Sequence, residues 1–358
     1  SDLSTITLIM KKLQIIIAIF TISLAAANAQ DFSSQLDSTK MRERVKRISA
    51  DEFEGRGPGN EGSKKAADYI VSEMKAAGIK PGNRKSFFKK SYFQNVKLVG
   101  VKVDPATQMT FSGRSGEPKS FKFGDDFVAT TGAQTPNVSV DAEVVFMGYG
   151  IDAPLYKWND YSGPAEDYRG KVLIIMVNDP PATTDEPNLF GGKALTYYGR
   201  WTYKYEEAAR RGAAGVILIH TTESAGYGWN VVRTSFGGPR SEIAREPGST
   251  TPFLNLMSWM TDATAKAVMS QAGLDFEGMR MKAATRNFRP VKTNLRVKID
   301  MKTDMRTFES PNIVGVIEGS DKKLKSEYVL YTAHWDHLGI GEADTTGDRI
   351  YNGAYDNA

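Results

Sequence analysis

Continuous runs of apolar residues are the feature that most limits how this chain can fold. Residues 142–151 read AEVVFMGYGI and residues 170–178 read GKVLIIMVN. GVILIH at 215–220 follows a helical pattern that begins near Trp201, buries Tyr205 on its inner face and stops at a glycine turn. Strands that are apolar on both faces are typical of sheets covered by helices on both sides. The sequence therefore predicts an α/β fold.

Further strand patterns flank this region and indicate how the chain is divided. NLRVKIDMKT at 294–303 alternates strictly and predicts a half-buried strand, while NIVGVIEG and EYVLYTA predict strands covered on both faces. A strand TPFLNLM and a helix from Ser258 to about Ala272 complete a small α+β unit, which we expect to span 136–292. The larger domain would then occupy 30–135 and 293–358.

A glycine-rich loop and an amphipathic helix stand near the start of the larger domain. EGRGPGNEG at 54–62 predicts a flexible loop. A helix is expected from about Ser63, a good N-cap residue, because Ala66, Ile70 and Met74 repeat at helical spacing. Gly78 would end this helix.

The N-terminal region has the three parts of an export signal. Lys11 and Lys12 precede a short apolar stretch, and Ala27-Asn28-Ala29 offers small residues at the cleavage positions. The stretch is too short to span a membrane comfortably, and a buried core helix is disfavoured because the stretch is not amphipathic. We therefore predict a signal peptide at 10–29 and an exported protein, periplasmic or secreted, with no membrane span after cleavage.

Composition narrows the chemistry that is available. The 358 residues carry 46 Lys and Arg against 42 Asp and Glu, a net charge of +4, and the basic residues form no patch that would indicate nucleic-acid binding. Cysteine is absent and there are three histidines, so a metal would be held by imidazole and carboxylate groups.

A histidine and two aspartates follow the last apolar run. His334 comes directly after it, Asp336 lies two residues on, and Asp356 follows in NGAYDNA. His334 is therefore expected at the carboxyl end of a strand, where α/β sheets bind ligands. Asp336 could fix the imidazole tautomer, and Asp356 could bridge two cations that share a water of pKa about 7. From these residues alone, a strand-end histidine bonded to a neighbouring aspartate remains an open alternative.

These segments resemble the co-catalytic dizinc aminopeptidases, a family that includes glutamate carboxypeptidase-like enzymes. TAHWDHLGIG followed by IYNGAYDNA resembles their metal-binding core, and EGRGPGNEGSKKAADYIVSEMKAAGIKP resembles their N-terminal signature. The unit containing YEEAARRGAAGVILI resembles the protease-associated domain that is often inserted before the metal site. The resemblance runs from about Val45 to Ala358. It implies a zinc-exopeptidase-type mixed sheet flanked by helices, incomplete here and interrupted by a small α+β protease-associated domain.

The resemblance also assigns roles to individual residues. His334 would bind one zinc ion, Asp336 would be the catalytic carboxylate that orients His334, and Asp356 would bridge two zinc ions. His337 matches no ligand position, and His220 is expected to be structural. Glu342, Asp344 and Asp348 form an acidic loop in which calcium binding is less favoured than plain solvation.

The family pattern further requires a Glu-Glu pair, another acidic ligand and a final histidine after the bridging aspartate. Only Asn357 and Ala358 follow here. The resemblance therefore implies an N-terminal fragment that holds zinc weakly and does not turn over substrate. The full-length protein is expected to be an exported zinc aminopeptidase that hydrolyses N-terminal peptide bonds of peptide or protein substrates through a metal-bridged hydroxide.

Three alternatives stay open at this point. A carboxypeptidase acting on acidic dipeptides would use the same fold with basic residues in its pocket. A receptor-like or binding relative would keep the architecture without catalysis. A mononuclear-zinc cyclase or transferase would retain histidine and aspartate ligands as well.

Overall fold

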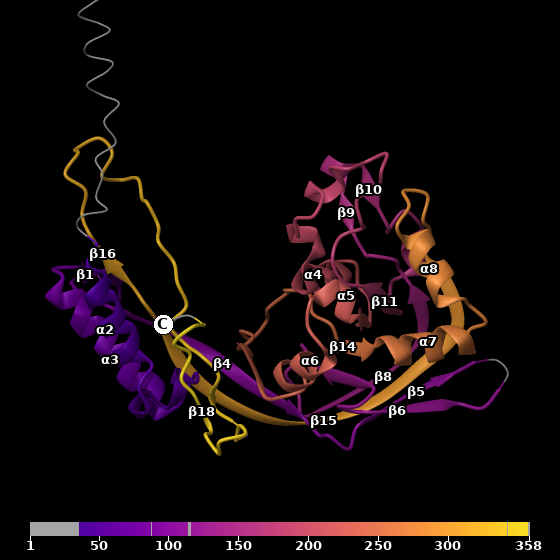
Figure 1. Cartoon of the computed structure of the whole chain (residues 1–358), viewed down its shortest axis with the longest axis horizontal. Helices are drawn as coiled ribbons and strands as arrows, with labels where there is room; N and C mark the ends of the chain where they lie inside the picture. The colour runs from indigo at the N-terminus through magenta and orange to yellow at the C-terminus, as the bar shows by residue number, and fades with distance from the viewer. Residues whose placement is uncertain (1–35, 87, 114–115, 342, 357–358) are drawn as a thin grey trace, which may run out of the picture. The chain divides into compact units, whose positions relative to one another are not determined.

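The computed structural model describes residues 36–86, 88–113, 116–341 and 343–356 (Figure 1). The chain divides into two compact units, one of residues 1–80 and 317–358 and the other of residues 81–316. The predicted signal peptide at 10–29 lies outside the described residues. Within the described part of the chain, no helix combines the length and the apolar character needed to cross a bilayer.

The larger unit is built on a mixed sheet, which has ten strands among the described residues. Eight of them form the path β13-β4-β15-β8-β11-β12-β14-β7, and β5 pairs with both β15 and β6. The neighbours β8, β11, β12 and β14 run parallel, and the other pairs are antiparallel. The strands are β4 (Phe93–Val103), β5 (Gln108–Ser112), β6 (Lys119–Lys122), β7 (Phe127–Thr130), β8 (Asn137–Phe146), β11 (Val172–Met176), β12 (Gly215–His220), β13 (Arg240–Ile243), β14 (Leu256–Thr261) and β15 (Val291–Ile313).

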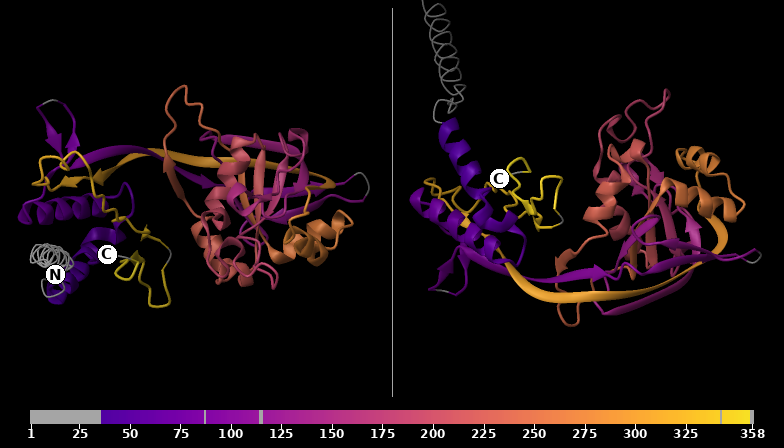
Figure 2. Two further views of the ribbon diagram at one scale, coloured as in Figure 1. Left: turned by 90° about the horizontal axis from the view of Figure 1, so that it is seen from above. Right: turned by 60° about the horizontal axis from the view of Figure 1, so that its bottom comes forward.

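Helices cover both faces of the parallel strands. Val172 and Ile174 of β11 belong to a core shared with α7 and α8, whereas Leu173 and Ile175 belong to a core shared with α4 and α6. Figures 1 and 2 show α7 and α8 on one side of these strands and α4 on the other. Burial on both faces accounts for the continuous apolar runs. The predicted α/β fold, with a mixed sheet flanked by helices, is confirmed. The helices are α4 (Trp201–Arg210), α5 (Thr222–Ala225), α6 (Trp229–Ser235), α7 (Asp262–Gln271) and α8 (Phe276–Ala283).

β15 is the long curved strand of this sheet (Figure 1). Its predicted alternation is confirmed, because Leu295, Val297, Ile299 and Met301 are buried while the residues between them are exposed. A bulge lies between Lys292 and Arg296, where the register against β8 shifts. Asn294 adopts a positive φ of 57° inside the bulge, a conformation that asparagine tolerates better than most residues.

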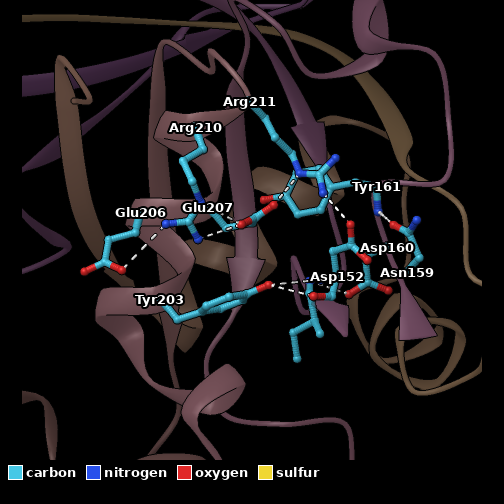
Figure 3. Close-up of polar contacts among 10 residues, drawn as sticks. Asp152, Asn159, Asp160, Tyr161, Tyr203, Glu206, Glu207, Arg210 and Arg211 are labelled. Atoms are coloured by element: carbon cyan, nitrogen blue, oxygen red, sulfur yellow. Dashed lines mark hydrogen bonds and ion pairs between the residues drawn. The ribbon is translucent and has the colours of Figure 1, made fainter. Parts of the chain in front are cut away.

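A polar network joins the segment between β8 and β11 to helix α4 (Figure 3). Arg211 donates hydrogen bonds to Asp152 at 2.5 Å and to Glu207 at 2.6 Å, and its guanidinium lies 4.3 Å from the centre of the Tyr161 ring. Tyr203 donates to the carbonyl of Asp152 at 3.2 Å. The short elements of this unit are β2 (Asn83–Arg84), β3 (Lys90–Ser91), β9 (Asp152–Ala153), η3 (Pro154–Tyr156), β10 (Trp158–Asn159), η4 (Ala165–Asp167), η5 (Leu189–Gly191) and η6 (Tyr197–Gly199), and β1 (Lys80–Pro81) and β16 (Gly315–Val316) stand where the chain passes between the units.

The smaller unit contains two helices whose ends follow ordinary capping rules. They are α2 (Ser38–Ile48) and α3 (Glu61–Ala76), with the 3₁₀ helix η2 (Asp51–Arg56) between them and the two-residue strands β17 (Gly339–Ile340) and β18 (Ile350–Tyr351) later in the chain. α3 begins two residues before the predicted Ser63, because Asn60 is the N-cap and accepts from the Ser63 backbone N–H at 2.6 Å. Gly78 follows the helix with a φ of 75°, as expected for a terminating glycine.

Three predicted elements are wrong. NIVGVIEG at 312–319 was expected to be a strand covered on both faces, but it is divided between β15 and β16, none of its residues is buried and Ile317 is 79% exposed. The helix expected from Ser258 begins at Asp262, because Ser258 lies within β14 and Thr261 caps the helix by accepting from the Thr264 N–H. EYVLYTA at 327–333 forms no strand, and Leu330 is 81% and Tyr331 90% exposed. An apolar strand needs a neighbouring strand and a covered face. In the described part of this unit, residues 327–333 pair with no strand.

The compact units do not begin and end where the sequence placed the insert. The larger unit spans 81–316 rather than 136–292. It is wider because β4 and β5, which precede residue 136, pair with β15, which follows residue 290. The assignment of peptidase and protease-associated domains to the segments 30–135, 136–292 and 293–358 stays a prediction.

Candidate metal centre

The predicted ligands lie on two segments of the smaller unit that flank a short hairpin. His334 and Asp336 precede β17, and Asp356 follows β18. Gly339 pairs with Tyr351, so the chain returns antiparallel to itself. The hairpin therefore brings the two segments to the same region although neither belongs to a long strand.

The structure brings His334, Asp336 and Asp356 together. Nδ1 of His334 lies 2.9 Å from the backbone carbonyl of Asp336 and 3.5 Å from its carboxylate. Nε2 of His334 faces the Asp356 carboxylate at 3.9 Å. A proton on Nδ1, donated to the carbonyl, leaves the Nε2 lone pair directed toward Asp356. The strand end that was expected to hold His334 is absent from the described structure, so hairpin pairing positions this residue instead.

The donor atoms of this pair suit a zinc ion. Zinc binds imidazole nitrogen and carboxylate oxygen at about 2.0–2.2 Å, which puts two tetrahedral ligand atoms about 3.3 Å apart. The 3.9 Å separation between Nε2 and the Asp356 oxygen closes to this value with a small side-chain movement, and both side chains are at least half exposed. Within residues 36–356 as described, no cluster of three or more such ligands is found. The described pair therefore supplies two of the ligands that zinc takes.

The two other histidines have different surroundings. His337 donates its backbone N–H to the carbonyl of Arg56 at 3.2 Å, and its ring lies against Gly353. Partial burial lowers the pKa of His337, and the Asp356 carboxylate opposes this shift. His220 belongs to the larger unit and is the last residue of β12. Its imidazole lies against aromatic rings, one of them that of Tyr227.

The aspartate carboxylates of the acidic loop accept hydrogen bonds from the backbone N–H groups of the same loop. Asp344 accepts hydrogen bonds from the N–H groups of Thr346 at 2.7 Å and Asp348 at 3.1 Å. Asp348 accepts from the Ile350 N–H at 2.8 Å. These carboxylates hold the turn between β17 and β18. Glu342 lies outside the described residues.

Arg56 is the residue at this site that the sequence did not reveal. Its side chain is buried, with 1% of the residue exposed, and it donates only to backbone carbonyls. These acceptors are Trp335 at 2.9 Å, Ile48 at 2.8 Å, Asn352 at 2.7 Å and Gly353 at 3.1 Å. Burial lowers the pKa of Arg56, and the nearby Asp336 charge opposes the shift.

The glycine-rich loop around Arg56 is closely packed. Gly55 has a φ of 62°, and a Cβ atom there would lie 2.5 Å from the carbonyl oxygen of Gly339 and 2.6 Å from that of Tyr351. Glycine is required because another residue would be both strained and in collision. The expectation of a flexible loop was therefore wrong. The signal available in the sequence was a glycine next to an arginine within a polar run. Such a glycine indicates a place where two backbone segments approach closely.

Of the comparisons with known proteins, one matches a peptidase family over the segment that bears the candidate site. Residues 312–358 match the model of peptidase family M28, a segment that includes all three predicted site residues. A comparison with curated proteins gave no match. Among solved structures, BSAP, a zinc aminopeptidase from Bacillus subtilis, aligns at 12% identity and a TM-score of 0.28, a level at which the likeness supports no inference. The alignment covers 78% of this chain and 47% of that chain, so this chain spans about half the length of the enzyme.

The comparisons leave the inserted protease-associated domain and the roles of the individual site residues as predictions. The family match does extend across both flanks of the hairpin that bears His334 and Asp356. Over residues 312–358 the chain carries the sequence pattern of peptidase family M28, which confirms the resemblance to the metallopeptidases.

Proposed function

We propose that the chain carries part of the metal centre of an exported zinc-dependent exopeptidase, with N-terminal peptide bonds as its target. The observation that supports this most directly is Nε2 of His334 facing the Asp356 carboxylate at 3.9 Å within the segment that matches peptidase family M28. Zinc, when bound, would polarise the scissile carbonyl and activate water.

The residues of this chain would act by holding and orienting that metal. The Asp336 carbonyl accepts from Nδ1 of His334 and so keeps Nε2 available as a ligand. Asp356 has two carboxylate oxygens, which fit it to bridge two ions, as proposed from the resemblance. The lysine-rich start and small-residue end of segment 10–29 support export.

The proposal is tested on the natural protein expressed from its complete reading frame. Chromogenic aminoacyl substrates with a free amine should be hydrolysed, and N-acetylated versions and acidic dipeptides should not. A chelator should remove the activity and zinc should restore it. The variants His334→Ala and Asp356→Asn should lose more than about 100-fold in kcat/KM, more than is typical for an outer-shell residue.

Asp68→Asn is the matched control, because Asp68 is an exposed carboxylate of α3 in the same unit. It should retain wild-type activity. Hydrolysis that resists the chelator, or that survives in Asp356→Asn, would contradict the proposal. Zinc binding without turnover of any peptide would instead favour a binding relative of the family.

A further inference from the structure

One guanidinium ties together both segments that carry the candidate ligands. Nε of Arg56 donates to the carbonyl of Trp335, the residue next to His334. Nη1 and Nη2 donate to the carbonyls of Asn352 and Gly353, which precede Asp356. The same side chain also holds the end of α2 through the carbonyl of Ile48.

The backbone of Arg56 adds a fourth contact to the segments that carry the candidate ligands. Its carbonyl accepts from the N–H of His337 at 3.2 Å, on the segment that bears His334. Gly353 approaches so closely that a Cβ atom there would lie 2.7 Å from Nη2 of Arg56. The hairpin between these segments has only two paired residues on each strand. Such a short ladder cannot by itself fix the distance between its flanks.

The chemistry of these contacts requires arginine. Each acceptor is a backbone carbonyl, and the planar guanidinium presents five N–H donors in fixed directions. A lysine ammonium keeps the charge but cannot reach carbonyls on three separate segments in one plane. The side chain is buried, so an N–H group that lost its carbonyl acceptor could not bind water instead, and the folded state would lose free energy.

We propose that Arg56 is the positioning residue of the metal centre, setting the separation between His334 and Asp356 by binding the backbone on both sides. This inference rests on the proposed function for its metal, but the contacts concern this chain alone. Arg56 touches no substrate and no ligand atom. It acts through the two loops it joins.

Zinc affinity of the chain is the direct test, measured by calorimetry on the wild type and on Arg56→Lys and Arg56→Met. Both variants should bind zinc about 10–100-fold more weakly, the range typical when outer-shell support of a metal ligand is lost. Arg44→Met is the control, because Arg44 pairs with Glu73 on the exposed surface of the same unit, and its affinity should equal the wild type. Wild-type affinity in Arg56→Lys would overturn the proposal, since charge alone would then suffice.

A second measurement uses NMR to follow the imidazole and the guanidinium themselves. ¹⁵N-histidine NMR of the metal-free wild type reports the His334 tautomer, which should be Nδ1-protonated, and Arg56→Lys should show a mixture. Slow hydrogen exchange of the Arg56 Nε–H should become slower still on adding zinc. If the Arg56 N–H groups exchange at the rate of free arginine, Arg56 does not bind the backbone carbonyls and the proposal is overturned. If these groups are protected but zinc does not bind, the proposed function fails while the positioning role of Arg56 stands.

Discussion

Gly353 occupies a position of the metal centre that no larger residue can take. It has a φ of 66°, and a Cβ atom would lie 2.6 Å from the His337 ring and 2.7 Å from Arg56. Gly353→Ala should therefore destabilise the segment 334–356 by roughly 2–4 kcal/mol, from backbone strain plus overpacking. Hydrogen exchange of peptides from this segment measures the loss.

Gly347→Ala is the matched control for that change. Gly347 also has a positive φ, 92°, but nothing lies within 4 Å of a Cβ atom placed there. Its substitution should cost only the backbone strain, about 1 kcal/mol. Equal effects of the two variants would mean that the contact among Gly353, His337 and Arg56 does not form.

Asp160 gives the larger unit a dependence of stability on pH. Burial raises its pKa to about 7 from 3.8, although it accepts from the Ile151 N–H and the Trp158 indole. The folded state thus holds a proton between about pH 4 and pH 7 that the unfolded chain has released. The stabilisation is complete below pH 4 and is lost as the pH rises to 7, on the order of 1–4 kcal/mol.

Lys204 acts in the opposite sense. It is buried, donates to the carbonyls of Tyr149 at 2.7 Å and Asn178 at 3.0 Å, and burial lowers its pKa to about 7. Its contribution is therefore lost as the pH falls from 10.5 through 7. Urea unfolding of Asp160→Asn should lack the loss of stability between pH 4 and 7, whereas the exposed-site control Asp125→Asn should keep it. An unchanged slope in Asp160→Asn would contradict the assignment.

The sequence indicated some residues of the site and missed others for a physical reason. His334, Asp336 and Asp356 could be named because residue type and short spacing limit their chemistry. Arg56 could not, because its role depends on carbonyls contributed by segments almost three hundred positions away, which no local pattern encodes. Backbone acceptors have no side-chain signature.

At the scale of elements, strands were predicted correctly where another strand or a helix packs against their apolar residues. β11, β12 and the alternating part of β15 follow their apolar periodicity because helices or strands cover the expected faces. EYVLYTA has an equally strong pattern but no neighbouring strand among the described residues, so it remains extended and exposed. Periodicity reports which surface can be buried and not what buries it.

The start of α3 depends on a single capping side chain. Asn60 accepts from the Ser63 N–H at 2.6 Å and donates to the Glu54 carbonyl at 3.3 Å, so it joins the helix to η2. Asn60→Ala should lower stability by about 1 kcal/mol, and Asn60→Ser should keep most of the cap. Thermal unfolding followed by circular dichroism compares the two, and equal melting temperatures would count against the capping role.

At the scale of the whole molecule, the units differ in how much core they contain. All three buried apolar clusters that the described residues form lie within 81–316. A polypeptide of residues 81–316 should therefore fold alone and unfold in one cooperative transition. Calorimetry would show this, and a broad transition with exposed hydrophobic surface would mean that the unit depends on the rest of the chain.

Calorimetric titration of this chain with zinc most directly tests the central claim, that His334 and Asp356 hold a metal together. Because the described residues offer two donors, we expect binding weaker than about 1 µM, or roughly 8 kcal/mol. Asp356→Asn should abolish this heat, and Asp68→Asn should leave it unchanged. Binding of equal strength in Asp356→Asn, or tight uptake of two ions in the nanomolar range, would contradict the claim.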